Sequence, residues 1–289
     1  MLVLFTDTDT DITPQVAKEY GYRLISMPYT VGDTDVHPYA DSDTFDFKPF
    51  YDMLRGGTIP KTSAIGSEAY VSYFEPVFAA GDDILYVHFS RAMTATFDVM
   101  DKTVAELLKK YPERRFYAID TMSITIGCYY LVREIGDLYL QGKTAEELVA
   151  YAEREIQHTA LYFFADDLKF FRASGRVSGI AGAMGTLLGI RPIIYVDKTG
   201  RMVSIGKEKG RRNAVEHLLR TVDELGDSIK EHRVIIGHTD APGIADEVEA
   251  RLIERFGSDL RTEKVIVNPT IGSHCGPNGV GICFHAIHR

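Results

Sequence analysis

Short apolar segments alternate with amphipathic ones along the first half of the chain, and this alternation constrains the fold more than any other feature. Residues 83–88 form an apolar run, residues 95–110 carry apolar side chains at helical spacing, and residues 116–120 are apolar again. This order is typical of βαβ units, whose strands pair in parallel. The expected strands are residues 2–6, 22–27, 83–88 and 116–120. The expected helices are residues 14–20, 46–55, 67–80 and 95–110, followed by a glycine-containing helix near Gly127.

The second half repeats the pattern after an amphipathic helix expected at residues 144–158. The predicted strands are residues 161–165, 193–196, 202–206, 234–238 and 264–267, and the predicted helices are residues 210–225 and 241–256. We therefore predict an α/β protein of two α/β domains, residues 1–158 and residues 159–289, the first with a mainly parallel sheet.

Charge and cysteine content exclude several classes of protein. The chain has 32 Lys and Arg against 41 Asp and Glu, a net charge of −9, whereas nucleic-acid-binding proteins usually show a basic excess. The apolar run after Met1 is too short for a signal peptide or a membrane span. The three cysteines form no CxxC pair, so neither disulfides nor a zinc site are indicated. We expect a cytoplasmic protein without a nucleic-acid partner, membrane span or metal.

Hydroxyl side chains follow several of the predicted strands. In an open parallel sheet, ligands bind beyond the carboxyl ends of the strands, so these loops are candidate walls of a site. Each hydroxyl by itself is most simply a helix N-cap, but several together could hold a small anion. The residues concerned are Thr6, Thr8, Thr62, Ser63, Ser90, Thr94, Thr121 and Ser123.

A segment rich in small residues lies at the centre of residues 163–195. Residues 172–176 form a polar loop with two arginines, and residues 179–189 then alternate Gly and Ala with larger apolar residues. One interpretation is a Gly-rich helix packed closely against a sheet, with solvated arginines. The other is a surface for a ligand with an apolar body and an anionic head.

Two further loops have open interpretations. Asp and Thr alternate over residues 6–11 after the first strand, which favours Asx-turns and N-caps over a metal loop, because the Gly and distal Glu of a calcium loop are absent. Near the end of the chain, residues 269–281 surround His274 with glycines and prolines. This predicts a loop of defined shape around His274, and both a structural and a functional role for His274 stay open.

Four segments together resemble the DegV family of fatty-acid-binding proteins. They are the Thr62-Ser63 loop with Ser67, residues 166–178, residues 209–212 and residues 271–278. The resemblance implies that one long-chain fatty acid lies in the cleft between the domains, its carboxylate held by hydroxyls and its tail in an apolar tunnel. It also implies a partner, the ATP-using subunit of a bacterial fatty acid kinase, and an acyl phosphate used in phospholipid synthesis. No cofactor is implied.

The resemblance also implies roles for individual residues. Thr62 and Ser63 look like carboxylate ligands, and Thr94 stands where the family has a Ser with the same role. Ser90 is a further candidate for binding the ligand. Arg176 and His274 look like groups around the head that assist phosphoryl transfer. Arg211 looks like part of the surface that docks the kinase. Two departures are the missing Pro after Thr62-Ser63 and the presence of Arg91, a possible extra cation near the head.

Two other functions remain open from the residues alone. One is a stand-alone hydrolase of acyl esters with Ser63 or Cys275 as nucleophile and His274 as base, although no GxSxG motif is present. The other is a small-anion sensor that uses the same loops. The chain has no P-loop or kinase signature, so a carrier without its own ATP site is the preferred hypothesis.

Overall fold

The computed structural model describes residues 1–178 and 189–289. The first half contains a parallel sheet of order β2-β1-β6-β7, as the alternation predicted. Its strands are β1 (Leu2–Asp7), β2 (Arg23–Ile25), β6 (Asp83–His88) and β7 (Phe116–Asp120). Phe5, Leu85 and Tyr86 are fully buried, because helices cover this sheet.

Side-chain caps mark the start of some helices of the first half. Thr144 and Glu147 form a capping box at the start of α6, in which each side chain accepts a backbone N–H. Gly66 occupies the N-cap position of α3, without a side-chain cap. The helices are α1 (Pro14–Tyr20), α3 (Ser67–Ala79), α4 (Thr96–Lys110), α5 (Ile126–Leu140) and α6 (Ala145–Glu155), with short 3-10 helices η1 (Thr8–Thr10), η2 (Arg91–Met93) and η3 (Ile156–His158).

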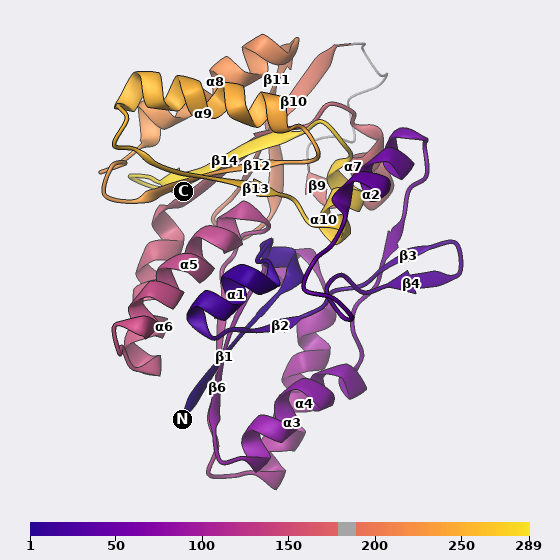
Figure 1. Ribbon diagram of the computed structural model, residues 1–289, viewed down its shortest axis with the longest axis vertical. Helices are drawn as coiled ribbons and strands as arrows, with labels where there is room; N and C mark the ends of the chain where they lie inside the picture. Colours follow the sequence, from indigo (N-terminus) through magenta and orange to yellow (C-terminus); the bar gives the residue numbers. More distant parts are fainter. Residues whose placement is uncertain (179–188) are drawn as a thin grey trace.

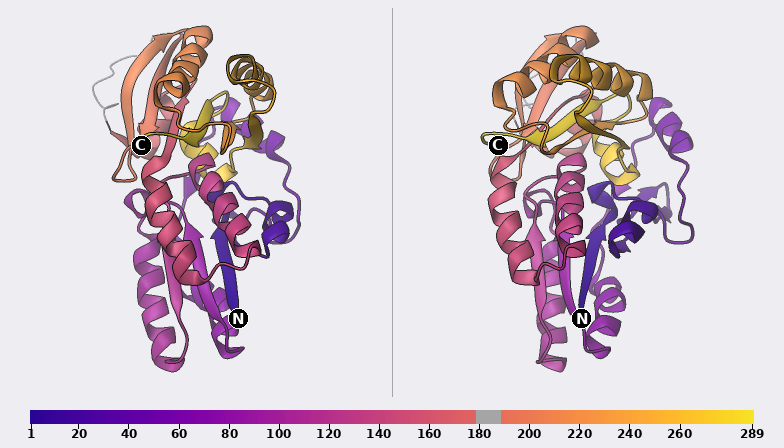
Figure 2. Two further views of the ribbon diagram at one scale, coloured as in Figure 1. Left: turned by 90° about the vertical axis from the view of Figure 1, so that its left-hand side faces the viewer. Right: turned by 60° about the vertical axis from the view of Figure 1, so that its left-hand side comes forward.

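The second half forms a mixed sheet of order β13-β12-β14-β8-β10-β11-β9, so most of its neighbours run antiparallel. Its strands are β8 (Thr159–Phe164), β9 (Val177–Ser178), β10 (Ile190–Val196), β11 (Met202–Lys209), β12 (Arg233–His238), β13 (Arg261–Ile266) and β14 (Val280–His285). Helices α8 (Arg211–Leu225) and α9 (Pro242–Phe256) cover its outer face (Figures 1 and 2).

Helix α5 of the first half packs on the opposite face of this second sheet. This packing joins the two halves of the chain. Alternation along β14 separates the faces: Ile282 and Phe284 pack with α8 and α9, whereas Cys283 belongs to the core that also contains Phe5 and Ile135. All strands described for the second sheet follow residue 158, but one core cluster crosses that position. The boundary between residues 158 and 159 therefore stays a prediction.

The region after β2 contains part of a third sheet. The hairpin of β3 (Tyr29–Val31) and β4 (Thr34–Val36) pairs through β3 with β5 (Lys61–Thr62). Helix α2 (Phe47–Arg55) connects this small sheet to the second half of the chain, because the Tyr51 hydroxyl donates to the carbonyl oxygen of Val267 at 2.7 Å. Thr62, expected in a loop, is thus held by strand pairing.

Two expected loops are helical. Helix α10 (Pro269–Cys275) replaces most of the shaped loop around His274, and its Asn268 cap accepts from the N–H of Ile271. A Cβ on Gly272 would lie 2.8 Å from the Tyr51 hydroxyl, so this glycine permits close packing against α2. Helix α7 (Lys169–Ser174) contains Arg172, and Gly175 ends it in a left-handed conformation.

The interpretations of the Gly-rich segment concern mainly residues 179–188, which lie outside the described residues. In the parts of the chain that the structure describes, no helix has the length and apolar character needed to cross a membrane.

Candidate functional site

A pocket of about 620 Å³ lies where the loops after β1 and β6 meet β5 and α10. We call it the head pocket. Its wall combines hydroxyls, one imidazole, one guanidinium and one carboxyl group with several apolar side chains. The lining residues are Asp9, Met27, Thr62, Ser63, Ala64, Phe89, Met93, Thr94, Thr96, Ile124, Arg176, Met202, Thr270, Ile271 and His274.

Thr62 and His274 form the hydrogen-bonded centre of this wall. The Thr62 hydroxyl lies 3.0 Å from Nε2 of the His274 imidazole. Burial, with the nearby Arg176 charge, lowers the pKa of His274 to about 4. The imidazole is therefore neutral near pH 7, with one nitrogen as a donor and the other as an acceptor.

Ser63, Thr94 and Arg176 complete the polar wall. Ser63 and Arg176 are exposed, and the Arg176 guanidinium donates to the carbonyl oxygen of Ser174 at 2.5 Å. The Thr94 hydroxyl accepts from the N–H of Thr96 at 3.2 Å, which leaves its own proton free to donate. The structure thus brings Thr62, Ser63, Thr94, Arg176 and His274 to one pocket, although their roles stay predictions.

Ser90, Arg91 and Arg211 lie elsewhere. The buried Ser90 hydroxyl accepts from the N–H of Ala92 and is not part of the head-pocket wall. Arg91, expected as an extra cation near the head, instead forms a two-point ion pair with Asp101 at 2.6 and 3.0 Å. Arg211 is exposed at the first position of α8, as a residue of a docking surface would be.

A second pocket, of about 480 Å³, is almost wholly apolar, and we call it the tail pocket. It shares Ile124, Met202 and Ile271 with the head pocket, so the two chambers are neighbours. Its lining residues are Ile124, Thr125, Ile126, Leu161, Phe163, Phe164, Ala165, Met202, Gly237, His238, Thr239, Val267, Ile271, Cys275, Gly279, Val280 and Gly281.

Paired glycines shape part of the tail pocket. Gly237 on β12 and Gly281 on β14 are register partners. A Cβ on Gly237 would lie 2.6 Å from the Ile126 side chain, and a Cβ on Gly281 would lie 2.8 Å from Phe163. The absence of side chains therefore lets α5 approach the sheet closely, and it keeps this part of the wall free of polar groups.

Cys275 lines the tail pocket, where burial disfavours its nucleophilic thiolate form. Burial raises the pKa of its thiol to about 12, so the thiolate is scarce near pH 7. His274, the neighbouring residue in sequence, is bonded to Thr62. These contacts speak against Cys275 and His274 as a catalytic pair.

The acidic loop after β1 contributes a site residue that sequence reasoning missed. The Asp7 carboxylate accepts from the N–H of Asp9, which confirms the predicted turn. Burial was not expected, yet Asp7, Asp9 and Asp11 are all buried, and Asp9 lines the head pocket. The available signal was the position of the loop at the carboxyl end of the first parallel strand.

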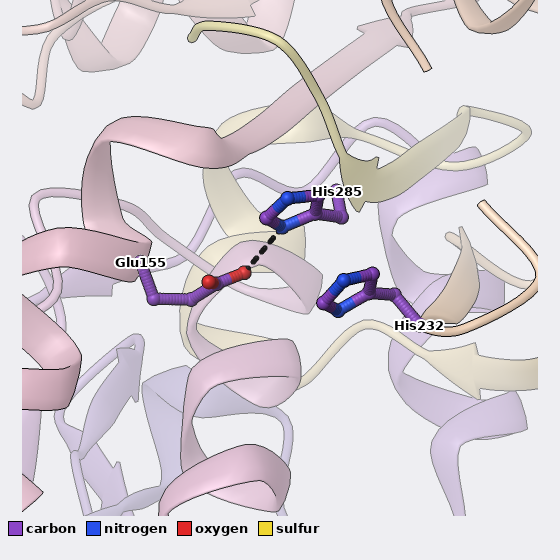
Figure 3. A group of neighbouring side chains, drawn as sticks. All are labelled: Glu155, His232 and His285. Atoms are coloured by element: carbon purple, nitrogen blue, oxygen red, sulfur yellow. Dashed lines mark hydrogen bonds and ion pairs between the residues drawn. The ribbon is translucent and has the colours of Figure 1, made fainter. Parts of the chain in front are cut away.

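A separate cluster of Glu155, His232 and His285 brings together residues from the two halves of the chain (Figure 3). The His285 imidazole bonds the Glu155 carboxylate at 2.7 Å, and the Tyr130 hydroxyl donates to the same oxygen at 2.9 Å. The imidazoles of His232 and His285 stack with 8° between their planes. A cation in the plane of one ring would lie outside the plane of the other, so this geometry favours a hydrogen-bonded network.

Comparison with known proteins decides the family. The protein-family model described as "Uncharacterised protein, DegV family" matches residues 1–286 of this chain. The chain belongs to the DegV family. A DegV domain-containing protein of Clostridium perfringens is 28% identical over 283 residues, which cover 98% of this chain and 96% of the relative.

Solved structures of DegV family proteins share the fold. A stearic-acid-binding protein from Eubacterium ventriosum superposes with a TM-score of 0.88 at 17% identity, covering 99% of this chain and 98% of the other. A DegV family protein from Thermus thermophilus, reported for its fatty acid binding, gives a TM-score of 0.86 at 19% identity, covering 99% of each chain. These likenesses establish the α/β architecture of this family member.

Proposed function

We propose that this DegV family protein binds one long-chain fatty acid, with the carboxylate in the head pocket and the acyl chain in the tail pocket. The observation that carries the proposal is the contact between a chamber whose wall combines polar and apolar groups and a chamber that is almost wholly apolar, through Ile124, Met202 and Ile271. An amphiphile with one anionic end matches this division of polarity. The fatty acids bound by the Eubacterium and Thermus relatives support the same ligand class.

The energetics favour retention of such a ligand. A buried carboxylate needs hydrogen bonds, because leaving it unpaired costs several kcal/mol. Thr62, Ser63 and Thr94 offer hydroxyl donors, and Arg176 offers a cation at the edge of the pocket. Each methylene group of the tail contributes ~0.8 kcal/mol when it leaves water, part of which offsets the cost of ordering the ligand.

We further propose that the protein presents the carboxylate to a separate ATP-using subunit, which forms the acyl phosphate used in phospholipid synthesis. His274 and Arg176 stand beside the proposed head position and would assist phosphoryl transfer there. The surface for that partner would include Arg211. Arg211 and Arg212 have no ion pair within the described part of the chain, whereas Arg191 is paired with Asp166.

Mass spectrometry of an acidified organic extract tests the ligand class. Protein purified under native conditions should yield a long-chain fatty acid at about one molecule per chain. An empty extract, from protein that also fails to take up added oleate or palmitate, would refute the proposal.

The two alternative functions predict different results. A hydrolase would turn over acyl esters and would lose that activity in Ser63→Ala. An anion sensor would gain thermal stability from inorganic phosphate and none from fatty acid. The thermal assay should be run beside the extraction on the same preparation.

A further inference from the structure

The Asp9 carboxyl group occupies an unusual place in the wall of the head pocket. Its residue is 3% exposed, and Oδ1 has no hydrogen-bond partner among the described residues. The backbone around it is fixed, because its carbonyl oxygen accepts from the N–H of Thr125 at 3.1 Å. A buried oxygen without a partner costs free energy, and Asp9 is one of the residues that line a pocket that a ligand can fill.

The groups around Asp9 oppose its ionisation. Burial, followed by the charges of Asp7 and Asp11, raises the pKa of Asp9 well above its ordinary value, and a hydrogen bond from Thr270 opposes this only in part. The other two carboxyl groups of the loop have donors of their own. The Tyr86 hydroxyl on β6 donates to Asp7, and Asn268 before α10 donates twice to Asp11.

Among the described residues that line the head pocket, the charged or titratable ones other than Asp9 are Arg176 and His274. Arg176 is exposed at the edge, and the His274 imidazole is neutral near pH 7 because its pKa is about 4. The head pocket therefore lacks a buried cation to neutralise two carboxylates. When two carboxyl groups share such a site, they retain one proton between them.

We propose that Asp9 is a head-group residue that stays protonated in the complex and donates its O–H to the carboxylate of the bound fatty acid. This inference rests on the proposed function. The bond is a charge-assisted O–H···O⁻ hydrogen bond, about twice as strong as a neutral one. Apart from proton uptake, no covalent bond is formed or broken. Where Asp9 is ionised in the free protein, one proton enters from solvent as the anion binds.

Two substitutions of Asp9 distinguish a protonated Asp9 that donates a hydrogen bond to the ligand from an ionised Asp9 that repels it. Asp9→Asn keeps a donor at this position without a charge, and Asp9→Ala removes the donor. The measurement is the dissociation constant of dodecanoate near pH 7 by isothermal titration calorimetry after delipidation. Asp120→Asn is the control, since Asp120 is a partly buried carboxyl with a raised pKa that is not part of the head-pocket wall.

The expected order follows from one lost hydrogen bond. Asp9→Asn and Asp120→Asn should bind within about threefold of the wild type, and Asp9→Ala should bind about tenfold or more weakly. Tighter binding by both Asp9 variants would show an ionised, repelling Asp9 and would overturn the inference. Unchanged binding by Asp9→Ala would overturn it too, because Asp9 would then make no contact.

Carbon-13 NMR gives an independent readout of the proton. In the complex of Asp-labelled protein, the carboxyl resonance that disappears in Asp9→Asn should have the shift of a neutral acid. The shift of a carboxylate would refute the inference even if the affinities agreed. Failure of the wild type and all variants to bind any fatty acid would instead overturn the proposed function itself.

Discussion

The hydroxyl of Thr62 lies 3.0 Å from the Nε2 atom of His274, although 212 positions separate the two residues in the chain. Thr62 ends β5 of the small sheet, and His274 lies on α10. The polar centre of the head pocket therefore exists only when two distant segments are packed together. Tyr51 on α2 supports the same junction through its bond to Val267.

We expect Thr62→Ala to weaken fatty acid retention by ~1–3 kcal/mol, because a buried polar partner is left unpaired. Thr62→Ser, which keeps the hydroxyl, is the matched control and should retain most of the affinity. A competition assay with a fluorescent fatty acid measures both. Equal ligand occupancy in Thr62→Ala and the wild type would remove Thr62 from the site.

Chain-length preference should depend on the junction of the two pockets. Ile124 lines both, so Ile124→Phe places extra volume where the acyl chain passes from one to the other. We expect palmitate affinity to fall about tenfold, roughly the effect of 1–3 kcal/mol of overpacking, and decanoate affinity to fall less. Titration of a series of saturated acids checks this. A uniform loss at all lengths would place the acyl chain elsewhere.

The acidic loop should make stability fall as pH rises. Burial raises the pKa of Asp11 to about 7, so its neutral form is favoured in the folded state. The stabilisation is complete below the pKa of the unfolded chain and is lost as the pH rises towards 7. This group alone should lower the free energy of unfolding by ~1.4 kcal/mol per pH unit between about pH 4 and about pH 7.

Asp11→Asn tests this dependence without disturbing the backbone. Asn tolerates the left-handed φ of 59° at this position, and its amide oxygen can still accept from Asn268. Urea unfolding at several pH values should give a smaller decline for the variant than for the wild type. The decline should not vanish, since burial also raises the pKa of Asp7. Identical slopes would show that Asp11 ionises as freely in the fold as in the unfolded chain.

Gly237→Ala should destabilise the protein, since the new Cβ would lie 2.6 Å from Ile126 on α5. We expect a loss of ~1–3 kcal/mol in the free energy of unfolding. Gly243→Ala is the control: Gly243 lies in α9, and apart from its chain neighbours and its own helix backbone no atom lies within 4 Å of its hypothetical Cβ, so a gain of up to ~1 kcal/mol is expected. Calorimetric unfolding of both variants gives the comparison, and equal stabilities would contradict the close approach of α5.

Local patterns in the sequence determined the α/β class and many elements. The strands at residues 83–88 and 116–120 have the predicted bounds, because apolar runs flanked by polar turns fix short buried strands locally. Hydroxyl residues that follow the predicted strands can also be recognised locally. If the strands are parallel, several of these residues are expected at the carboxyl edge of the sheet. The sequence therefore predicts Thr62, Ser63 and Thr94 as candidate site residues, and the glycine-rich loop predicts His274, whereas their convergence in one pocket does not follow from local patterns.

Tertiary structure decided which of those residues meet, and it formed helices where local signals predicted loops. Helix α10 contains glycine and serine, which favour turns, but packing of Gly272 against Tyr51 stabilises it as a helix. The Ser90 hydroxyl caps the N–H of Ala92, and the Arg91 guanidinium pairs with Asp101, so neither side chain contributes to the wall of the head pocket. The burial of Asp9 likewise depends on distant segments such as α10, and periodicity reports only on neighbours within a few residues.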